Sequence, residues 1–119
     1  MLKKIIVTGG DGRFAQELKK NKSKYNFVFR NKNQLNILSI KSIEKNIKEF
    51  KPKYVLHLAG LSRPMSIHDH KISRSIDLNI VGTCNLVKIC ILKKIKLIFF
   101  STSYVYPGTK GNYKETDPV

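Results

Sequence analysis

The chain alternates short apolar runs with longer segments of helical periodicity. Runs rich in β-branched, leucine and aromatic residues occur at four places: Ile5–Val7, Tyr25–Phe29, Lys53–Gly60 and Lys96–Thr102. Continuous apolar runs of this length are typical of strands buried on both faces of a sheet. Because helical patterns separate them, the order predicts right-handed βαβ units and a parallel sheet. The expected fold class is therefore α/β.

The segment after the second run predicts a helix with a defined start and end. Ser39 is a good N-cap residue, and Pro52 is expected to stop the helix. The spacing predicts one apolar face made of Ile40, Ile43, Ile47 and Phe50. Just before this helix, Leu35-Asn36-Ile37 is expected to form a short extended piece.

A longer helix is predicted between the third and fourth runs. The residues that indicate it fall on or near a four-residue repeat: Ile72, Ile76, Ile80, Val87 and Ile91. This repeat predicts one long helix packed on the sheet. The two cysteines, Cys84 and Cys90, lie in the same pattern without a C-x-x-C motif, and we expect buried thiols in a reducing cytosol.

Composition argues against several classes of protein. The apolar runs are far shorter than a membrane span, and no secretory signal is readable after Met1, so we expect a cytoplasmic protein without membrane contact. The chain carries 23 Lys+Arg against 8 Asp+Glu, a formal net charge of +15, which raises the hypothesis of nucleic-acid binding. The lysines are spread along the chain, however, and base composition explains a joint excess of lysine, isoleucine and asparagine. We therefore expect no nucleic-acid partner.

The strongest candidate site follows the first predicted strand. Gly9-x-x-Gly12-x-x-Ala15 places glycines in a tight turn and a small residue where a helix must pack closely on the strand. A phosphate at the start of that helix would meet free N–H groups and the positive end of the helix dipole. The pattern predicts dinucleotide binding by a Rossmann-like sheet, with Asp11, Arg13 and Phe14 as further cofactor-binding candidates.

The end of the second predicted strand carries cations where such folds often place an acidic residue. Arg30 and Lys32 stand there, and either could pair with a phosphate on the adenosine ribose. The position therefore favours NADP(H) over NAD(H). The alternative interpretation is that both are ordinary surface cations in a lysine-rich chain.

Ligand-binding residues are also expected where the later strands end. Ala59, Gly60, Leu61 and Ser62 follow the third strand and could line a cofactor, and Ser101–Ser103 follow the fourth with hydroxyls that could orient a substrate carbonyl or alcohol. Serine and threonine at a strand end are also ordinary turn residues.

The three histidines are not expected to bind metal. His57 lies in a predicted buried strand and is expected to be a hydrogen-bonded core residue. His68 and His70 are two residues apart on a nascent helix and so do not share a face.

Taken together, the motifs resemble those of the extended short-chain dehydrogenase/reductases that act on nucleotide sugars, above all the RmlD-like dehydrorhamnose reductases. The residues that carry the resemblance are the TGGxGxxA loop, His57–Gly60, Leu78–Leu86, Ser101–Gly108 and Tyr113–Pro118. The resemblance implies the N-terminal part of a Rossmann-like, doubly wound parallel sheet, in one NAD(P)-binding domain over residues 1–119.

The resemblance also implies roles for single residues. Thr102 matches the hydroxyl that holds the reacting oxygen, with Ser103 beside it as a substrate contact. Asn79 matches an asparagine on the long helix. Asn36 and Ile37 match the adenine-contacting positions, although relatives often carry an aspartate where Asn36 stands.

The acid/base tyrosine and lysine of the family have no good match. The spacing Tyr-x-x-x-Lys occurs once, from Tyr106 to Lys110, and contains Pro107 and Gly108, so we expect a loop rather than a helix there. In relatives the pair lies downstream of the segment ending at Pro118, as does the sugar-nucleotide subdomain.

The functional hypothesis is an NAD(P)-dependent reductase or epimerase that transfers hydride at a sugar carbonyl or alcohol, with this chain alone nearly inactive. A nucleotide sugar is the expected partner, and a homo-oligomer is compatible with the sequence. The alternative is a non-catalytic dinucleotide-binding or regulatory module. The sequence does not select the sugar nucleotide or the outcome of the reaction.

Overall fold

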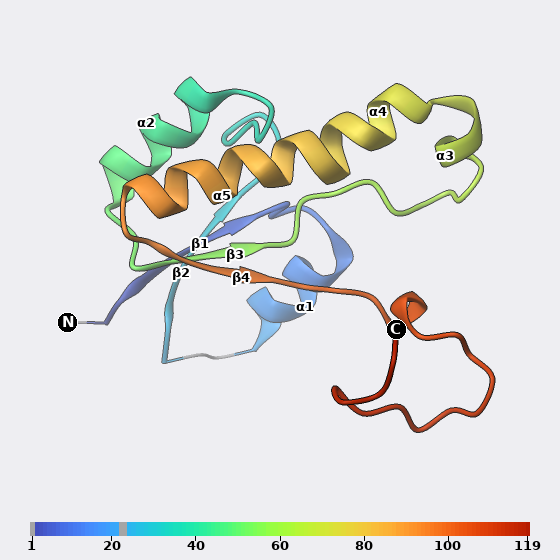
Figure 1. Cartoon of the computed structure of the whole chain (residues 1–119). Helices are drawn as coiled ribbons and strands as arrows, with labels where there is room; N and C mark the ends of the chain where they lie inside the picture. Colours follow the sequence, from blue (N-terminus) through green and yellow to red (C-terminus); the bar gives the residue numbers. More distant parts are fainter. Residues whose placement is uncertain (1, 22–23) are drawn as a thin grey trace.

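A computed structural model describes residues 2–21 and 24–119, and it contains a four-stranded parallel sheet in the order β2-β1-β3-β4. The strands are β1 (Lys4–Thr8), β2 (Asn26–Arg30), β3 (Tyr54–His57) and β4 (Lys96–Phe99). All carboxyl ends point to the same edge (Figure 1). Because β1 lies between β2 and β3, the chain reverses its winding direction there, which confirms the α/β Rossmann-like prediction.

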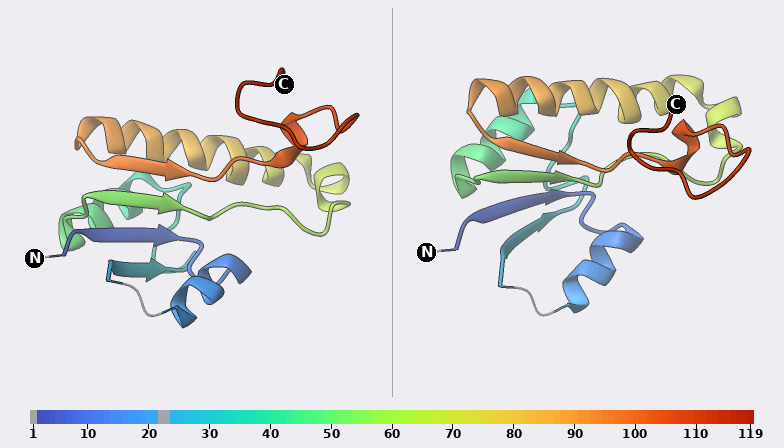
Figure 2. Two further views of the ribbon diagram at one scale, coloured as in Figure 1. Left: turned by 90° about the horizontal axis from the view of Figure 1, so that it is seen from below. Right: turned by 60° about the horizontal axis from the view of Figure 1, so that its bottom comes forward.

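Helices cover both faces of the sheet unequally (Figure 2). Helix α1 (Arg13–Lys20) packs on one face, while α2 (Ile40–Phe50) and a long helix cover the other. The long helix runs through α4 (Ile72–Ile76), the π-helical turn η1 (Asp77–Val81) and α5 (Gly82–Leu92). A short α3 (Ile67–His70) precedes it, and a 3₁₀ turn, η2 (Ser103–Val105), follows β4.

Two apolar clusters hold the layers together. The larger lies between the sheet and the two-helix face, and its fully buried members include Ile6, Ile43, Val55 and Leu86. The smaller lies under α1 and centres on Val7. Strands β1 and β3 each contribute to both clusters and are paired on both sides, so they are the two inner strands of the described sheet.

Helix α2 begins and ends as its sequence predicts. The Ser39 hydroxyl accepts a hydrogen bond from the Ser42 backbone N–H at 3.2 Å, and Lys51 closes the helix in the left-handed region, with φ 48°. The predicted face is correct at Ile43 and Ile47 and wrong at Ile40, which is exposed. Asn46 takes its place in the interior because Arg30 and the loop after β2 supply its hydrogen-bond partners.

The long helix was predicted correctly, but its buried face was not. The four-residue repeat is exposed along its whole length, from Ile72 to Ile91. The core contacts come from Gly82, Leu86, Ile89 and Cys90. Their spacing of four, three and one follows the 3.6-residue turn, whereas a strict repeat of four drifts around the helix.

Cys84 lies on this outer stripe, so the expectation of a buried thiol holds for Cys90 alone. By length and composition alone, Ile72–Leu92 could also cross a membrane, a test that core helices pass as well.

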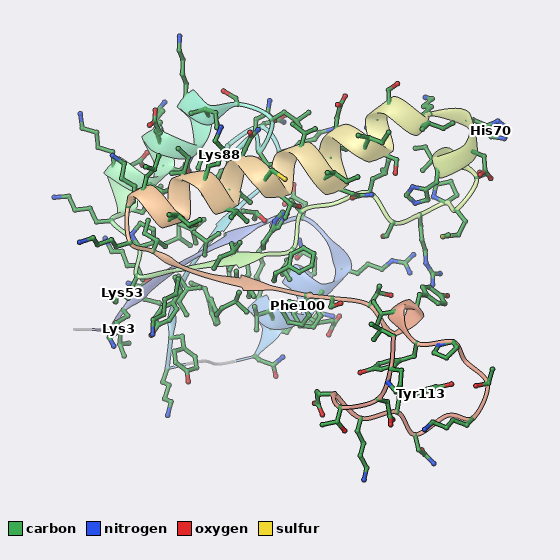
Figure 3. All side chains as sticks on the ribbon, in the orientation of Figure 1. Lys3, Lys53, His70, Lys88, Phe100 and Tyr113 are labelled. Carbon is green, nitrogen blue, oxygen red and sulfur yellow. The ribbon has the colours of Figure 1, made fainter. Side chains whose placement is uncertain are left out.

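Two further details differ from the sequence-based expectations. Leu35–Ile37 lies in a loop rather than in an extended piece. The apolar side chains of Leu35 and Ile37 are each buried in the core, but their backbone does not pair with a strand. Lysines that are dispersed in the sequence gather at the amino edge of the sheet, where Lys53 N–H donates to Lys4 O and Lys96 N–H donates to Lys53 O. Figure 3 shows Lys3 and Lys53 at this end of the molecule.

Gly82 is expected to be essential for packing the long helix. A Cβ on this residue would lie 2.6 Å from Cδ1 and 2.7 Å from Cγ1 of the buried Ile37. Gly82→Ala should therefore lower the free energy of unfolding by about 1–3 kcal/mol, measured by urea denaturation. Cys84→Ala, two residues along the same helix at an exposed position, is the control and should change stability little. Equal stability of the two variants would contradict this packing argument.

Candidate functional site

The glycine loop joins β1 to α1 at the carboxyl edge of the sheet. Gly9 has φ +66°, and a Cβ there would lie 2.8 Å from both the N and the Cα of Ala59. Only glycine satisfies both constraints. Gly12 is the N-cap of α1 and provides no side-chain cap, so the first N–H groups of the helix face the loop. The turn is closed by the Gly12 N–H, which donates to Gly9 O at 2.9 Å.

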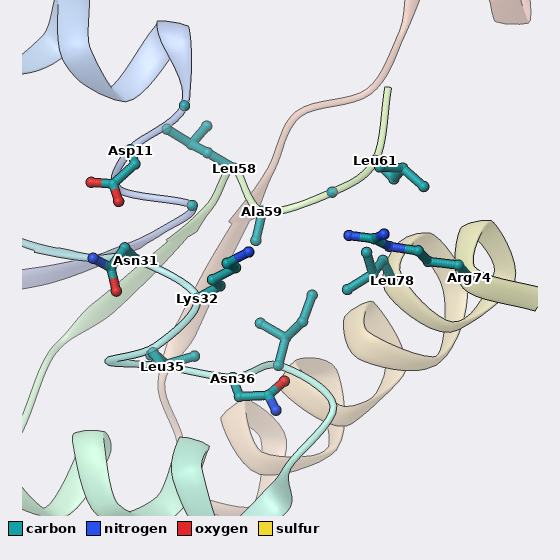
Figure 4. Close-up of a pocket in the computed structure, with 14 residues that line it drawn as sticks. Asp11, Asn31, Lys32, Leu35, Asn36, Leu58, Ala59, Leu61, Arg74 and Leu78 are labelled. Atoms are coloured by element: carbon teal, nitrogen blue, oxygen red, sulfur yellow. The ribbon is translucent and has the colours of Figure 1, made fainter. Parts of the chain in front are cut away.

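Three adjoining cavities form one groove along this edge, since each shares residues with the next. The first, of about 350 Å³, lies between the glycine loop, the loop after β2 and α4 (Figure 4). The second passes the start of α1 and includes Arg13 and Arg63. The third lies beside Phe14, Asn79 and Thr102. We call the three together the carboxyl-edge groove.

The structure brings most of the candidate residues into this groove. The lining residues among those predicted from sequence are Gly9, Asp11, Gly12, Arg13, Phe14, Asn36, Ile37, Ala59, Gly60, Leu61, Ser62, Asn79 and Thr102. They come from five separate segments of the chain, which meet because parallel strands end at one edge. The side chain of Ser103 lies outside the described part of the structure.

Arg30 is the exception, because its side chain turns away from the groove. Its Nε–H donates to Asn46 Oδ1 at 2.8 Å, and its guanidinium lies 4.7 Å from the centroid of the Phe50 ring. Both partners belong to α2. Arg30 therefore attaches β2 to α2 instead of lining the cavity, whereas Lys32 does line it.

A buried hydrogen-bond network fixes the strand ends that form the floor of the groove. The Thr8 hydroxyl oxygen accepts from the N–H groups of Leu58 and Ala59, both at 3.1 Å, so its proton is directed to His57 Nδ1 at 2.8 Å. On the other side the Thr83 hydroxyl donates to Asn79 O, so it accepts from His57 Nε2 at 3.0 Å.

These directions define the protonation state of His57. The ring accepts at Nδ1 and donates at Nε2, which is the neutral form. Burial also lowers the pKa of His57, because the charged ring would lose its hydration. The sequence-based prediction of a hydrogen-bonded core histidine is confirmed.

Asn79 clamps the turn after β3. Its Oδ1 accepts from Leu61 N–H at 2.7 Å, and its Nδ2 donates to Leu61 O at 2.9 Å. The residue lies in the π-helical turn of the long helix. One side chain thus satisfies both backbone groups of Leu61 and holds the Gly60–Ser62 turn against the groove.

The fourth strand brings Thr102 to the far end of the groove. Its Oγ1 accepts from the Tyr104 N–H at 3.2 Å, a turn contact that leaves the hydroxyl at the cavity wall. The predicted loop around Tyr106 and Lys110 is confirmed. Tyr106 stacks on Tyr113 with 4.8 Å between ring centroids, and Lys110 approaches Asp117.

Sequence reasoning missed several residues that line the groove. Arg74 and Leu78 reach it from the long helix, and Met65 and His68 reach it from the segment before that helix. A usable signal was present for Arg74, since it lies four residues before Leu78 and so shares its helix face. Within residues 2–21 and 24–119, no three His, Cys, Asp or Glu residues gather as a metal site would require.

Comparison with known proteins places the chain in a family. The family model described as RmlD substrate binding domain matches residues 3–119. The chain belongs to this family. It is 27% identical over 97% of its length to methionine adenosyltransferase 2 subunit beta of Bos taurus and covers 37% of that protein. Over 68% of its length it is 33% identical to the Xenopus laevis subunit, of which it covers 24%.

Solved structures of nucleotide-sugar enzymes share the fold. A Bacillus anthracis dTDP-4-dehydrorhamnose reductase in complex with NADP aligns with a TM-score of 0.82 and 23% identity, covering 92% of this chain and 40% of the reductase. A Thermus thermophilus UDP-glucose 4-epimerase in complex with NAD aligns with a TM-score of 0.80 and 20% identity, covering 97% of this chain and 43% of the epimerase. A GDP-6-OMe-4-keto-L-xylo-heptose reductase from C. jejuni aligns with a TM-score of 0.75 and 27% identity, covering 93% of this chain and 33% of that reductase. The chain thus spans less than half of each.

His57 should make folding stability depend on pH. Its folded pKa lies below the ordinary histidine value of 6.5, so the unfolded chain binds the proton more readily as pH falls through that value. The contribution of neutral His57 is complete above about pH 7 and should be lost as pH falls from 6.5 toward the lower folded pKa. Urea midpoints measured between pH 7.5 and 5 test this.

Two variants isolate the effect. His57→Gln should cost about 1–3 kcal/mol at pH 7.5, because it breaks the buried network, and it should flatten the pH dependence. The exposed His70→Gln should keep the wild-type slope. A wild-type slope in His57→Gln would show that other groups are responsible.

Proposed function

We propose that this chain is the dinucleotide-binding part of an NAD(P)-dependent reductase or epimerase acting on nucleotide sugars. The observation that carries the proposal is the uncapped N-terminus of α1, which faces the groove with free N–H groups that a pyrophosphate could meet. Gly9 makes this possible, because its close contact with Ala59, where no Cβ fits, forms the tight turn before the helix. The NADP and NAD complexes among the structural neighbours support the cofactor class.

The groove suits a dinucleotide in one orientation. Asn36 and Ile37 would lie beside the adenine, the α1 N-terminus beside the pyrophosphate, and Asn79 and Thr102 toward the nicotinamide end. When bound, the nicotinamide supplies or accepts the hydride. The residues of this chain would hold the cofactor and exclude water, and the Thr102 hydroxyl would orient the reacting sugar oxygen by a hydrogen bond.

The acid/base group is the part of the mechanism that this chain does not supply. Tyr106 and Lys110, the one pair with the family spacing, lie in a loop and make other contacts. Loss of a general acid/base lowers rates by about 10²- to 10⁴-fold. We therefore expect the 119 residues alone to be nearly inactive, with the acid/base pair and the sugar-binding region belonging to a longer protein of this family.

A second candidate function is a regulatory, non-catalytic subunit that retains dinucleotide binding. The curated relatives favour it, since they are named as beta subunits of methionine adenosyltransferase 2. Both functions are compatible with the expected cytoplasmic location and with a homo-oligomer.

Gly12→Val should weaken nucleotide binding without unfolding the protein. A Cβ added at residue 12 would lie 3.1 Å from Gly9 O, and a β-branched side chain would also occupy the space through which the pyrophosphate approaches. NADPH affinity should fall at least about tenfold by calorimetric titration, and Gly12→Ala should lie in between. Thr109→Val, in the C-terminal loop, is the matched control. Unchanged affinity in folded Gly12→Val would refute the assignment.

Enzyme and regulatory subunit are distinguished in the protein purified with its natural ends. The enzyme should oxidise NADPH at 340 nm when a nucleotide 4-keto sugar is added, and Thr102→Val should lower the rate about tenfold or more without weakening NADPH binding. Binding of NADPH without turnover of any 4-keto nucleotide sugar would favour the regulatory subunit.

A further inference from the structure

The outer cavity of the groove, at its adenosine end, is lined by two cations that form no ion pair with any described residue. Lys32, on the loop after β2, and Arg74, on α4, both line this cavity and the hollow next to it. Figure 4 shows their charged ends directed into the cavity from opposite walls. The two residues are far apart in sequence and are brought together by the fold.

Within residues 2–21 and 24–119, no carboxylate forms an ion pair with Lys32 or Arg74. The cavity and its neighbour also contain Asp11 and Asp77, but the ion pairs found in the described part of the chain are Glu17–Lys20 and Lys110–Asp117. Two unpaired cations that face one space repel each other and attract an anion. A phosphate would be held from both sides, by the guanidinium in a two-bond geometry and by the ammonium as a point charge.

Apart from Asp11 in the glycine loop, the rest of the cavity lining is uncharged and suits a nucleoside. Asn31 and Asn36 occupy it where an acidic residue would select an unphosphorylated ribose, and Leu35 and Ile37 supply apolar surface. Each asparagine is held by the backbone, since Asn31 Oδ1 accepts from Asn33 N–H and Asn36 Oδ1 accepts from Leu38 N–H. No carboxylate therefore competes for the ribose at these positions.

We propose that Lys32 and Arg74 together form the subsite for the 2′-phosphate of NADP(H), and that Arg30 does not take part. This inference rests on the proposed dinucleotide binding and adds the residues that select between the two cofactors. The selecting arginine then comes from the long helix rather than from the end of β2. Arg30 serves the fold through its contacts with Asn46 and Phe50.

The test compares NADPH with NADH in the protein purified with its natural ends. Lys32→Gln and Arg74→Gln should each weaken NADPH binding about tenfold, and the double variant should weaken it further, while NADH affinity changes less than about threefold. Dissociation constants come from the fluorescence of the reduced nicotinamide. As a second probe, 2′-AMP should compete better than 5′-AMP against NADPH in the wild type, and this advantage should vanish in the double variant.

Two controls separate this subsite from general effects. Lys88→Gln removes one charge from α5, away from the groove (Figure 3), and should leave both affinities unchanged, which excludes attraction by the net charge of +15. Arg30→Gln should lower the thermal midpoint and leave the ratio of NADPH to NADH affinity unchanged.

Each other outcome gives a definite answer. Unchanged NADPH binding in the double variant, or an equal loss of NADPH and NADH, would overturn the subsite. If the ratio of NADPH to NADH affinity depends on Arg30 and not on Arg74, the 2′-phosphate is bound at the end of β2 and the proposal is wrong. If the wild type binds NADH and NADPH equally, the subsite fails and the proposed function stands. If it binds neither, both fail.

Discussion

The contact between the carboxyl ends of β1 and β3 is the constraint on which the rest of the structure depends. Gly9 approaches Ala59 so closely that no Cβ fits, and the preceding Thr8 hydroxyl joins the two strand ends through Leu58, Ala59 and His57. Because the network is buried and every direction of its hydrogen bonds is determined, it has one arrangement. The glycine loop and the turn after β3 are therefore held as one rigid floor.

The long helix connects these strand ends to the loop on the other side of the groove. Thr83 and Asn79 connect it to His57 and Leu61, and one turn away Gly82 packs on Ile37 of the loop after β2. One helix thus positions the turn after β3, the loop after β2, and Arg74 between them. Three of the four arginines, at positions 13, 63 and 74, line the groove, where planar guanidinium groups suit phosphates, whereas Arg30 turns to α2.

Much of the fold and part of the site could be predicted from local pattern. The apolar runs, the glycine loop and the Ser39 cap are decided by nearby residues, so the four strands, the first turn and the start of α2 could be predicted. The prediction was wrong for the outer stripe of the long helix and for the burial of Cys84, because a repeat of four describes periodicity and not the neighbour that each face meets. Arg30 shows the same limit of local pattern. Its position after β2 predicted a phosphate contact, but its side chain binds Asn46 and Phe50 of α2 instead.

By itself, the sequence determined the α/β class, the glycine loop and the burial of His57 in a strand, because glycine conformations, capping and apolar runs act over a few residues. The neutral state of His57 follows from its tertiary partners Thr8 and Thr83. Only the tertiary structure decided which cations face the groove, which face of the long helix is buried, and where dispersed lysines gather. Those outcomes depend on residues about 40 positions apart or more that the fold brings together, such as Lys32 and Arg74 at one cavity and Gly82 and Ile37 under the long helix. The geometry of parallel strands, which end together at one edge, creates these contacts.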